Sequence, residues 1–181
     1  MNITQSILDF IFPDYCVGCQ VKGGCICSSC AESIPLCLPL PEEWMYACFS
    51  YKDPRMRALV HRLKYKSNFH ALNGLSNRII NEFSLFIKEK RLQNKRIIIV
   101  PVPSTPSRHR VRGGNQSSII AHLIKKSHSN FTLFEGVKAK NRESQVRTRN
   151  KRARAENIHG TLYMSKKTPD TGAIHIIIDD V

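Results

Sequence analysis

The stretch Ile174-His175-Ile176-Ile177-Ile178-Asp179-Asp180-Val181 decides the fold of this chain. An apolar run rich in β-branched residues, with no alternation of polar positions, is typical of a central parallel strand buried on both faces. Such a strand delivers the residues that follow it to the carboxyl edge of the sheet, where open α/β folds bind ligands. The pair Asp179 and Asp180 therefore predicts a site for a polyhydroxylated or metal-chelated ligand at that edge.

A second apolar run, residues 97–100, predicts another buried parallel strand, which ends at Pro101-Val102-Pro103 because proline cannot continue a ladder. Residues 104–116 are expected to form a loop that feeds a further helix. This loop carries a Gly113-Gly114 pair, and backbone N–H groups at a glycine turn together with guanidinium groups suit an anionic ligand. The arginines of the loop, at alternate positions, are Arg108, Arg110 and Arg112.

The composition indicates a globular protein with a polyanionic partner. The chain has 181 residues, 41% of them apolar, which is enough for one ordinary domain and a small additional module. Its 28 Lys and Arg against 14 Asp and Glu give a formal net charge of +14, so nucleic acid is the first candidate and phosphorylated small molecules are the second. No run approaches the roughly 18 apolar residues of a membrane span. Residues 1–13 are expected to form a short helix that ends at Pro13.

Four of the seven cysteines form two Cys-x-x-Cys pairs, Cys16 with Cys19 and Cys27 with Cys30. Two tight turns at this spacing can present four thiolates to one tetrahedral ion, which predicts a structural zinc site of the zinc-ribbon type in a reducing cytoplasm. A segment of about 30 residues has too small a core to fold alone, so the metal is expected to supply the folding free energy. Cys25 remains an alternative ligand. A redox dithiol and a catalytic zinc are disfavoured, because no βαβ pattern surrounds the pairs and four cysteines leave no open coordination position.

The cysteine module and a proline-rich linker are expected to occupy residues 1–42, and one α/β domain residues 43–181. Residues 47–51 predict a strand, and apolar residues at helical spacing predict helices from Pro54 to about residue 65 and from about residue 71 to 89. Lys64-Tyr65-Lys66, at the end of the first helix, flanks an aromatic ring with cations, which suits a base stacked over a phosphate contact. A solvated helix end has the same pattern, so both interpretations stay open.

Residues 138–154 contain eight Lys or Arg and one Glu. This density resembles a surface that displaces counterions from a phosphate backbone, and the absence of interleaved aromatic residues predicts weak dependence on base sequence. A solvated basic loop without a ligand is the alternative. Residues 162–164 predict a strand after this segment. The arginines expected to contact nucleic acid are Arg142, Arg147, Arg149, Arg152 and Arg154.

The ordered set of motifs resembles the ComF family of competence proteins, which is related to the GntX proteins and built on the type I phosphoribosyltransferase fold. The resemblance runs over most of the chain. The matching residues are the four paired cysteines, Tyr51, Leu63-Lys64-Tyr65, Val100-Pro101-Val102-Pro103, Arg110-x-Arg112-Gly113-x-Asn115-Gln116, Arg142-x-x-Gln145, Arg154-x-x-Asn157 and Ile176-Ile177-Ile178-Asp179-Asp180-Val181. The resemblance implies an α/β fold in which helices flank a parallel sheet behind a small zinc-ribbon-like module.

The resemblance implies that Asp179 and Asp180 hold the ribose hydroxyls of phosphoribosyl pyrophosphate, with Mg²⁺ on its pyrophosphate. Val102 and Pro103 would belong to the pyrophosphate side, together with the arginines of residues 108–112. In the family a phosphate loop follows the acidic pair directly. It has no counterpart before Val181, so the chain is expected to be truncated relative to the family.

The resemblance also implies a role in natural transformation. The protein would bind single-stranded DNA during uptake, in the cytoplasm or at the inner face of the cytoplasmic membrane, with a helicase and other competence proteins as partners. Besides the arginines of the basic segment, the residues expected to contact DNA are Lys64, Tyr65, Arg110, Arg112, Asn115 and Gln116. Two alternatives remain: a phosphoribosyltransferase that acts on phosphoribosyl pyrophosphate and a base or similar acceptor, and an inactive gene fragment.

Overall fold

The computed structural model describes residues 13–65, 69–141, 160–167 and 172–180. These residues form two compact units, one within residues 1–93 and one within residues 94–180. The helix expected before Pro13 and the arginines expected between residues 142 and 154 lie outside the described residues. No helix in the described ranges is long and apolar enough to cross a membrane.

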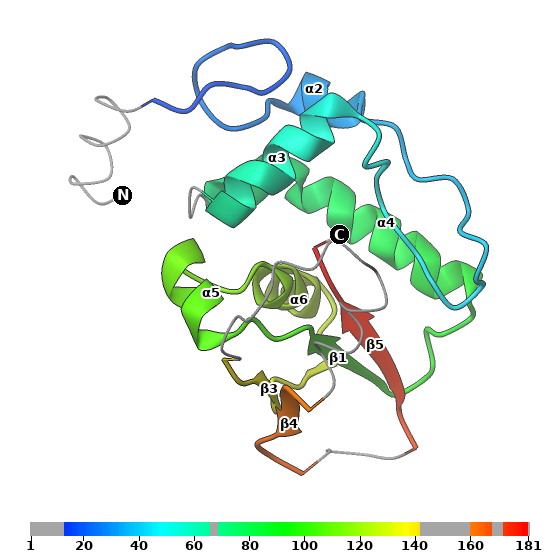
Figure 1. Cartoon of the computed structure of the whole chain (residues 1–181). Helices are drawn as coiled ribbons and strands as arrows, with labels where there is room; N and C mark the ends of the chain where they lie inside the picture. Colours follow the sequence, from blue (N-terminus) through cyan, green and yellow to red (C-terminus); the bar gives the residue numbers. More distant parts are fainter. Residues whose placement is uncertain (1–12, 66–68, 142–159, 168–171, 181) are drawn as a thin grey trace. The chain divides into compact units, whose positions relative to one another are not determined.

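The second unit is built on the strand β1 (Ile97–Pro101). This strand pairs in parallel with β2 (Thr132–Leu133) on one side and with β5 (Ile174–Ile178) on the other, which gives the order β2-β1-β5 (Figure 1). Its β-branched side chains suit a pleated surface that is covered on both sides. Ile97 and Ile99 are at most 1% exposed. The prediction of a buried central parallel strand is therefore confirmed for β1.

The strand β5 is parallel, as predicted, but it lies at the edge of the sheet that the described residues form. Ile174 pairs with Ile97 at one end, and Ile178 pairs with Pro101 at the other. Ile178 is 8% exposed, whereas Ile177 on the opposite face is 70% exposed. The interpretation of this run as a central strand buried on both faces is therefore wrong, because an apolar run does not by itself distinguish a central strand from an edge strand.

Two helices lie between β1 and β2 in the chain. The first is α5 (Pro106–Arg112), which replaces the loop expected over most of residues 104–116. Thr105 caps its start, Pro106 occupies the first turn, and Gly113 ends it in the left-handed conformation with φ of 68°. The second is α6 (Gln116–Ser127), which packs on β1, β2 and β5. The prolines and glycines that favour a loop therefore mark the two ends of a short helix.

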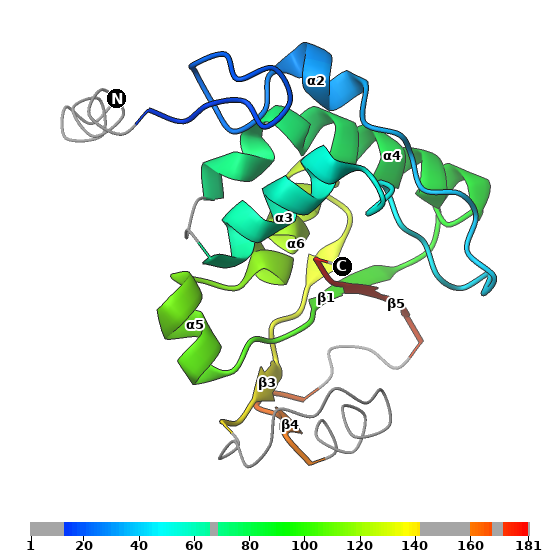
Figure 2. The same ribbon diagram turned by 45° about the horizontal axis from the view of Figure 1, so that its top comes forward.

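A separate antiparallel ribbon consists of β3 (Val137–Ala139) and β4 (Leu162–Met164). The two strands lie side by side in Figures 1 and 2 and do not join the three-stranded sheet. The strand predicted for residues 162–164 is confirmed. The ribbon brackets, in sequence, the part of the chain that holds most of the basic segment.

The first unit is helical. It comprises α2 (Ser28–Glu32), α3 (Pro54–Tyr65), the 3₁₀ helix η1 (Phe69–Leu75) and α4 (Ser76–Glu89). Both predicted helices are present, but the second begins at Ser76 and not near residue 71, because η1 precedes it. Their apolar faces are buried at Leu59, Leu63 and Phe83. The strand predicted for residues 47–51 is wrong, because this segment forms only an isolated antiparallel bridge between Phe49 and Leu36.

Candidate functional site

Four cysteine side chains come together in the first unit, and they are the four predicted as metal ligands. The Sγ atoms of Cys16, Cys19, Cys27 and Cys30 all lie within 4.8 Å of one another. The Cys27 Sγ lies 3.8 Å from that of Cys16 and 3.7 Å from that of Cys19. A tetrahedral ion with Zn–S bonds of about 2.3 Å separates its sulfur ligands by about 3.8 Å. The cluster can therefore hold a metal ion such as zinc.

Backbone hydrogen bonds fold the first cysteine pair into a tight turn. The N–H of Cys16 donates to the carbonyl of Val21 at 3.0 Å, and the N–H groups of Gly18 and Cys27 approach the Cys16 Sγ at 3.4 Å. Gly18 lies close to the Cys30 side chain. A Cβ at this position would lie 2.7 Å from the Cys30 Sγ.

The pKa values in the cluster show that its thiols do not ionise alike. Burial disfavours the Cys16 thiolate, but hydrogen bonds from the backbone of Cys19, Cys27 and Gly18 outweigh this effect and lower the pKa of Cys16 to about 6. Contacts with the sulfur atoms of Cys27 and then Cys16 raise the pKa of Cys30 to about 12. Four thiolates at these distances need a cation to compensate their charge, which a divalent metal supplies.

Cys25, the alternative ligand, lies outside the metal-binding cluster of the described residues. It is 2% exposed, and burial raises the pKa of its thiol. A raised pKa favours the neutral thiol over the thiolate that binds metal. The structure therefore favours Cys30 as the fourth ligand.

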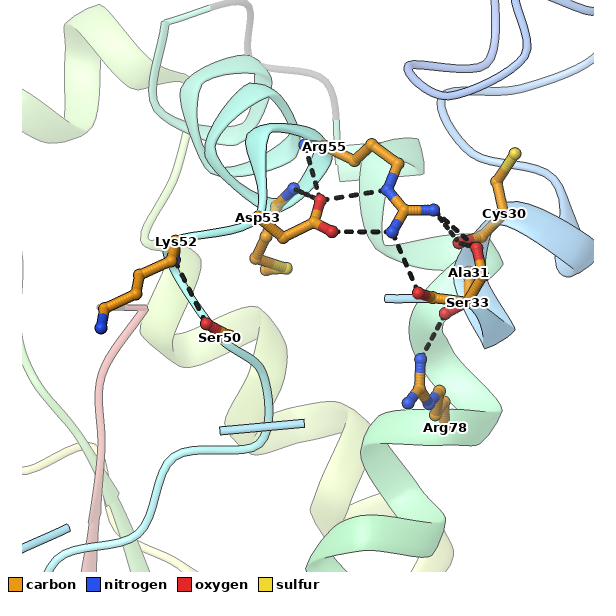
Figure 3. A network of polar contacts seen from close by, with 9 residues as sticks. Cys30, Ala31, Ser33, Ser50, Lys52, Asp53, Arg55 and Arg78 are labelled. Atoms are coloured by element: carbon orange, nitrogen blue, oxygen red, sulfur yellow. Dashed lines mark hydrogen bonds and ion pairs between the residues drawn. The ribbon is translucent and has the colours of Figure 1, made fainter. Parts of the chain in front are cut away.

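Asp53 and Arg55 form an ion pair at the start of α3, and the arginine donates hydrogen bonds to backbone carbonyls at and after Cys30 (Figure 3). Asp53 caps the helix by accepting the backbone N–H of Arg55 at 2.8 Å and also pairs with the Arg55 guanidinium at 2.7 Å. The guanidinium donates in turn to the carbonyl of Cys30 at 3.4 Å and to the carbonyl of Ser33 at 3.0 Å. Because α2 leaves these carbonyls without intrahelical partners, a cation at this position is favourable.

Two further arginines attach the cysteine turns to the helices. Arg78 of α4 donates to the carbonyl of Ala31, as Figure 3 shows. Arg62 of α3 donates to the carbonyl of Tyr15 at 2.8 Å. These two arginines therefore bind the backbone on both sides of the cysteine cluster, at Ala31 and at Tyr15.

The carboxyl ends of β1 and β5 meet in the second unit, as parallel neighbours do. The N–H of Val102 donates to the carbonyl of Ile178 at 2.9 Å, which places the residues after β1 beside the acidic pair. Asn115 Nδ2 donates to the carbonyl of Val102 at 2.9 Å, and the Ser117 hydroxyl donates to Asp179 Oδ1 at 3.0 Å. The start of α6 and the ends of two strands thus meet at Asp179.

The Asp179 carboxyl group has a pKa above its ordinary value. Burial of the group raises the pKa most, and the neighbouring Asp180 adds to the effect, against hydrogen bonds from the Asp180 N–H and from Ser117 that lower it. Asp179 as a whole residue remains exposed, whereas the Oδ2 atom of the neighbouring Asp180 is buried. Two adjacent carboxyl groups, one of them bound by Ser117 in the first turn of α6, can accept hydrogen bonds from hydroxyl groups or coordinate a divalent cation.

The other predicted binding residues are spread over several elements. Arg108 and Arg110 are exposed on α5 and Arg112 is half-buried, and because the segment is helical, only Arg108 and Arg112 share a face. Asn115 binds a backbone carbonyl, and Gln116 is 2% exposed, so neither side chain is presented openly. Pro103 is half-buried beside Val102, and Lys64 is half-buried in the last turn of α3. The Tyr65 side chain lies outside what the structure describes.

Positive charge is concentrated in the second unit. Residues 94–180 hold 17 Lys and Arg against 6 Asp and Glu, a net charge of +11, which leaves +3 for the rest of the chain. Within the described residues, the exposed lysines and arginines of this unit occur on several elements. They are Lys95, Arg96, Arg108, Arg110, Lys126, Lys138, Lys140, Lys166 and Lys167.

No family model matches the chain, and neither a curated protein nor a solved structure matches it. The function is therefore inferred from the cysteine cluster, from the acidic pair at the end of β5 and from the distribution of positive charge. Sequence reasoning assigned no role at these sites to five residues, namely Asp53, Arg55, Arg62, Arg78 and Ser117. The Asp-Pro pair before α3 is a helix-start signal that could have identified Asp53, whereas the contacts of Arg55 and Ser117 depend on residues distant in sequence.

Proposed function

We propose that the protein is a ComF-type competence protein that binds single-stranded DNA during uptake in natural transformation. The observation that carries the proposal is the uneven charge: the second unit alone has a net charge of +11. A protein surface of this kind gains affinity for a phosphate backbone by releasing condensed counterions. The ordered motifs that resemble the family support this function over that of a general polyanion binder.

The scaffold fits this proposal. The parallel sheet with an acidic pair at its carboxyl edge is compatible with a type I phosphoribosyltransferase fold, and the four cysteines are compatible with a zinc-ribbon-like module. We assign the metal a structural role, because four sulfur ligands leave no open position for a reacting water. A helicase and other competence proteins at the inner face of the cytoplasmic membrane belong to the same proposal.

Binding of a labelled single-stranded oligonucleotide at several salt concentrations tests the function. Affinity is expected to fall steeply with salt, and replacement of Arg108 and Arg110 by Ala should reduce the slope of log affinity against log salt by about 0.7 for each lost phosphate contact. The double variant Arg147→Ala and Arg149→Ala is expected to act in the same direction. Affinity that does not change with salt would reject the proposal.

A matched control uses the first unit. Arg57 and Lys88 are exposed on α3 and α4, and their replacement by Ala removes the same net charge from the whole protein. If the second unit binds the DNA, this control keeps the salt slope of the parent. Equal effects of both double variants would show that net charge, and not a defined surface, governs binding.

A second candidate is an enzyme that transfers phosphoribosyl groups from phosphoribosyl pyrophosphate to a base or similar acceptor. The contact between Ser117 and Asp179 favours it, because it fixes a carboxylate at the junction of β1, β5 and α6. In this proposal Asp179 and Asp180 would orient the ribose hydroxyls and stabilise positive charge on the ribose. Mg²⁺ would neutralise the pyrophosphate leaving group, with help from the arginines of α5.

Thermal unfolding with phosphoribosyl pyrophosphate and Mg²⁺ separates the two candidates. A ligand that binds the folded state raises Tm with ligand concentration. The rise is expected in the parent protein and not in Asp179→Asn, while DNA binding by this variant should persist. No rise in Tm and no release of pyrophosphate would leave only the DNA-binding function.

A further inference from the structure

The ribbon of β3 and β4 extends beyond its two strands at both ends. The N–H of Lys140 donates to the carbonyl of Thr161 at 2.8 Å, and the N–H of Ser165 donates to the carbonyl of Gly136 at 2.7 Å. The Ser165 hydroxyl donates to the same carbonyl at 2.9 Å. The ribbon therefore has a defined register from Gly136 to Lys140.

The ribbon is also anchored to the three-stranded sheet. The N–H of Phe134 donates to the carbonyl of Ile99 in β1 at 2.9 Å, and the Phe134 ring lies against Gly136 so closely that a Cβ there would be 2.2 Å from Cζ. Phe134 is 8% exposed. A two-stranded ribbon is marginally stable by itself, so this packing gives it a fixed base.

One face of the ribbon presents an aromatic ring on β4 beside two lysines on β3. Tyr163 is 44% exposed and is the cross-strand partner of Lys138 in the register. The Nζ of Lys140 lies 5.2 Å from the centroid of the Tyr163 ring. Residues two apart on a strand share a face, so both lysines stand on the same side as the ring. Both lysines are exposed.

We propose that Tyr163 is a stacking platform for an unpaired base, with Lys138 and Lys140 as contacts to the adjoining phosphates. The proposal rests on the proposed DNA-binding function and adds a contact that recognises the base as such. Aromatic side chains that stack on bases within a positively charged groove are the common device of proteins that bind single strands without sequence preference. The Nζ of Lys140 lies over the ring in the free protein, and stacking of a base on that face would move the ammonium group toward the adjoining phosphate.

The charges around the ring favour a nucleic acid over a protein partner. An apolar protein surface on Tyr163 would have to bury two lysines without compensation, which is unfavourable. A nucleic acid strand offers a flat apolar face and an anionic backbone together. The strand must be single, because a base in a duplex has no exposed face to stack on the ring.

Three probes of equal length test the proposal: a single-stranded oligonucleotide, the same strand with abasic sites, and the duplex. The parent protein is expected to prefer the strand with bases to the abasic strand. Tyr163→Ile keeps strand propensity and apolar character but removes the flat ring. It should lower affinity for the strand with bases about tenfold, within the range of one lost stacking contact, and leave affinity for the abasic strand unchanged.

Two control variants keep the result interpretable. Tyr163→Phe retains the ring and is expected to bind as the parent does. Leu162→Ala removes a side chain of similar exposure, 47%, from the opposite face of the same strand and should have no effect. Equal binding of the two single strands by the parent, or parental affinity in Tyr163→Ile, would overturn the proposal.

The lysines give an independent readout. Lys138→Ala and Lys140→Ala should each reduce the salt slope for both single strands by about 0.7, whereas Tyr163→Ile should leave the slope unchanged. An unchanged slope in both lysine variants would refute their role as phosphate contacts. If the parent binds no oligonucleotide at all, the proposed function fails and the stacking platform fails with it. If binding depends on salt but is equal for the strands with and without bases, the proposed DNA-binding function stands and only the stacking platform is refuted.

Discussion

Arg55 and Asp53 form a bidentate ion pair at the start of α3, with Nε to Oδ1 at 3.0 Å and Nη2 to Oδ2 at 2.7 Å. The same guanidinium donates to the carbonyl of Cys30, the fourth cysteine of the cluster. Hydrogen bonding to Arg55 lowers the pKa of Asp53, so the pair is ionised at neutral pH. The pair therefore couples the position of a metal ligand to the first turn of a helix.

Replacement of Arg55 by Met should weaken zinc binding about tenfold, because residues that orient a metal ligand typically affect affinity to this degree. Arg55→Lys should also weaken binding, since a single ammonium group cannot reproduce two parallel contacts with Asp53 and a third with Cys30. Competition with a chromophoric zinc chelator measures the affinity. Arg57→Met, an exposed position on the same helix, is the control. Equal affinities of Arg55→Met and Arg57→Met would contradict the positioning role.

From the four-cysteine cluster we expect each chain to bind one zinc ion. Cys19 is exposed, so Cys19→Ser removes a ligand without disturbing the core, and this variant is expected to lose most of the bound zinc and to melt at a lower temperature. Cys37→Ser, at a half-buried cysteine outside the cluster, should keep both the zinc and the Tm of the parent. Metal analysis and thermal unfolding with and without a chelator give the result. A parental zinc content in Cys19→Ser would exclude the four-cysteine site.

The close approach of Gly18 to Cys30 leads to a prediction about the geometry of the metal centre. A Cβ at position 18 would lie 2.7 Å from Cys30 Sγ and 3.3 Å from Cδ of Arg55. In the metal-free protein the Cys30 side chain can move aside, but in the metal-bound protein it is fixed. Gly18→Ala should therefore reduce zinc affinity while it leaves the stability of the chelator-treated protein nearly unchanged. Val21→Ala, exposed by 61% in the same turn, should change neither quantity; equal zinc affinity in both variants would contradict the prediction.

Local patterns predicted the parts of the molecule that local physics determines. The two Cys-x-x-Cys pairs bring their own sulfur atoms together, because each pair closes one tight turn. The run from Ile97 to Val100 predicted β1, and the apolar spacing through Leu63 predicted α3. In each case residues close in the sequence supply both the element and the reason for its burial.

The errors arise where the outcome depends on distant residues. The run ending at Ile178 has the same character as β1, but only its pairing shows that β5 lies at the edge of the described sheet. The loop predicted for residues 104–116 is a different kind of error, because its signals are local: Thr105, Pro106 and Gly113 mark the two ends of a short helix and were interpreted as a loop. No sequence pattern indicated the stacking platform proposed at Tyr163, because only the antiparallel pairing of β3 with β4 brings Lys140 to the ring.

The contact between Ser117 and Asp179 yields a final prediction about pH. Burial and the charge of Asp180 raise the folded-state pKa of Asp179 above the unfolded value of about 3.9, so its carboxylate costs stability at neutral pH. Asp179→Asn keeps an acceptor for Ser117 and removes the charge, so the variant should have a higher Tm than the parent at pH 7. The cost to the parent is relieved as pH falls through the folded pKa, and the difference in Tm should shrink there. A ligand-binding carboxylate is expected to be retained despite such a cost, whereas a structural one is not. A lower Tm for Asp179→Asn at pH 7 would show instead that the carboxylate stabilises the fold at the junction of β5 and α6.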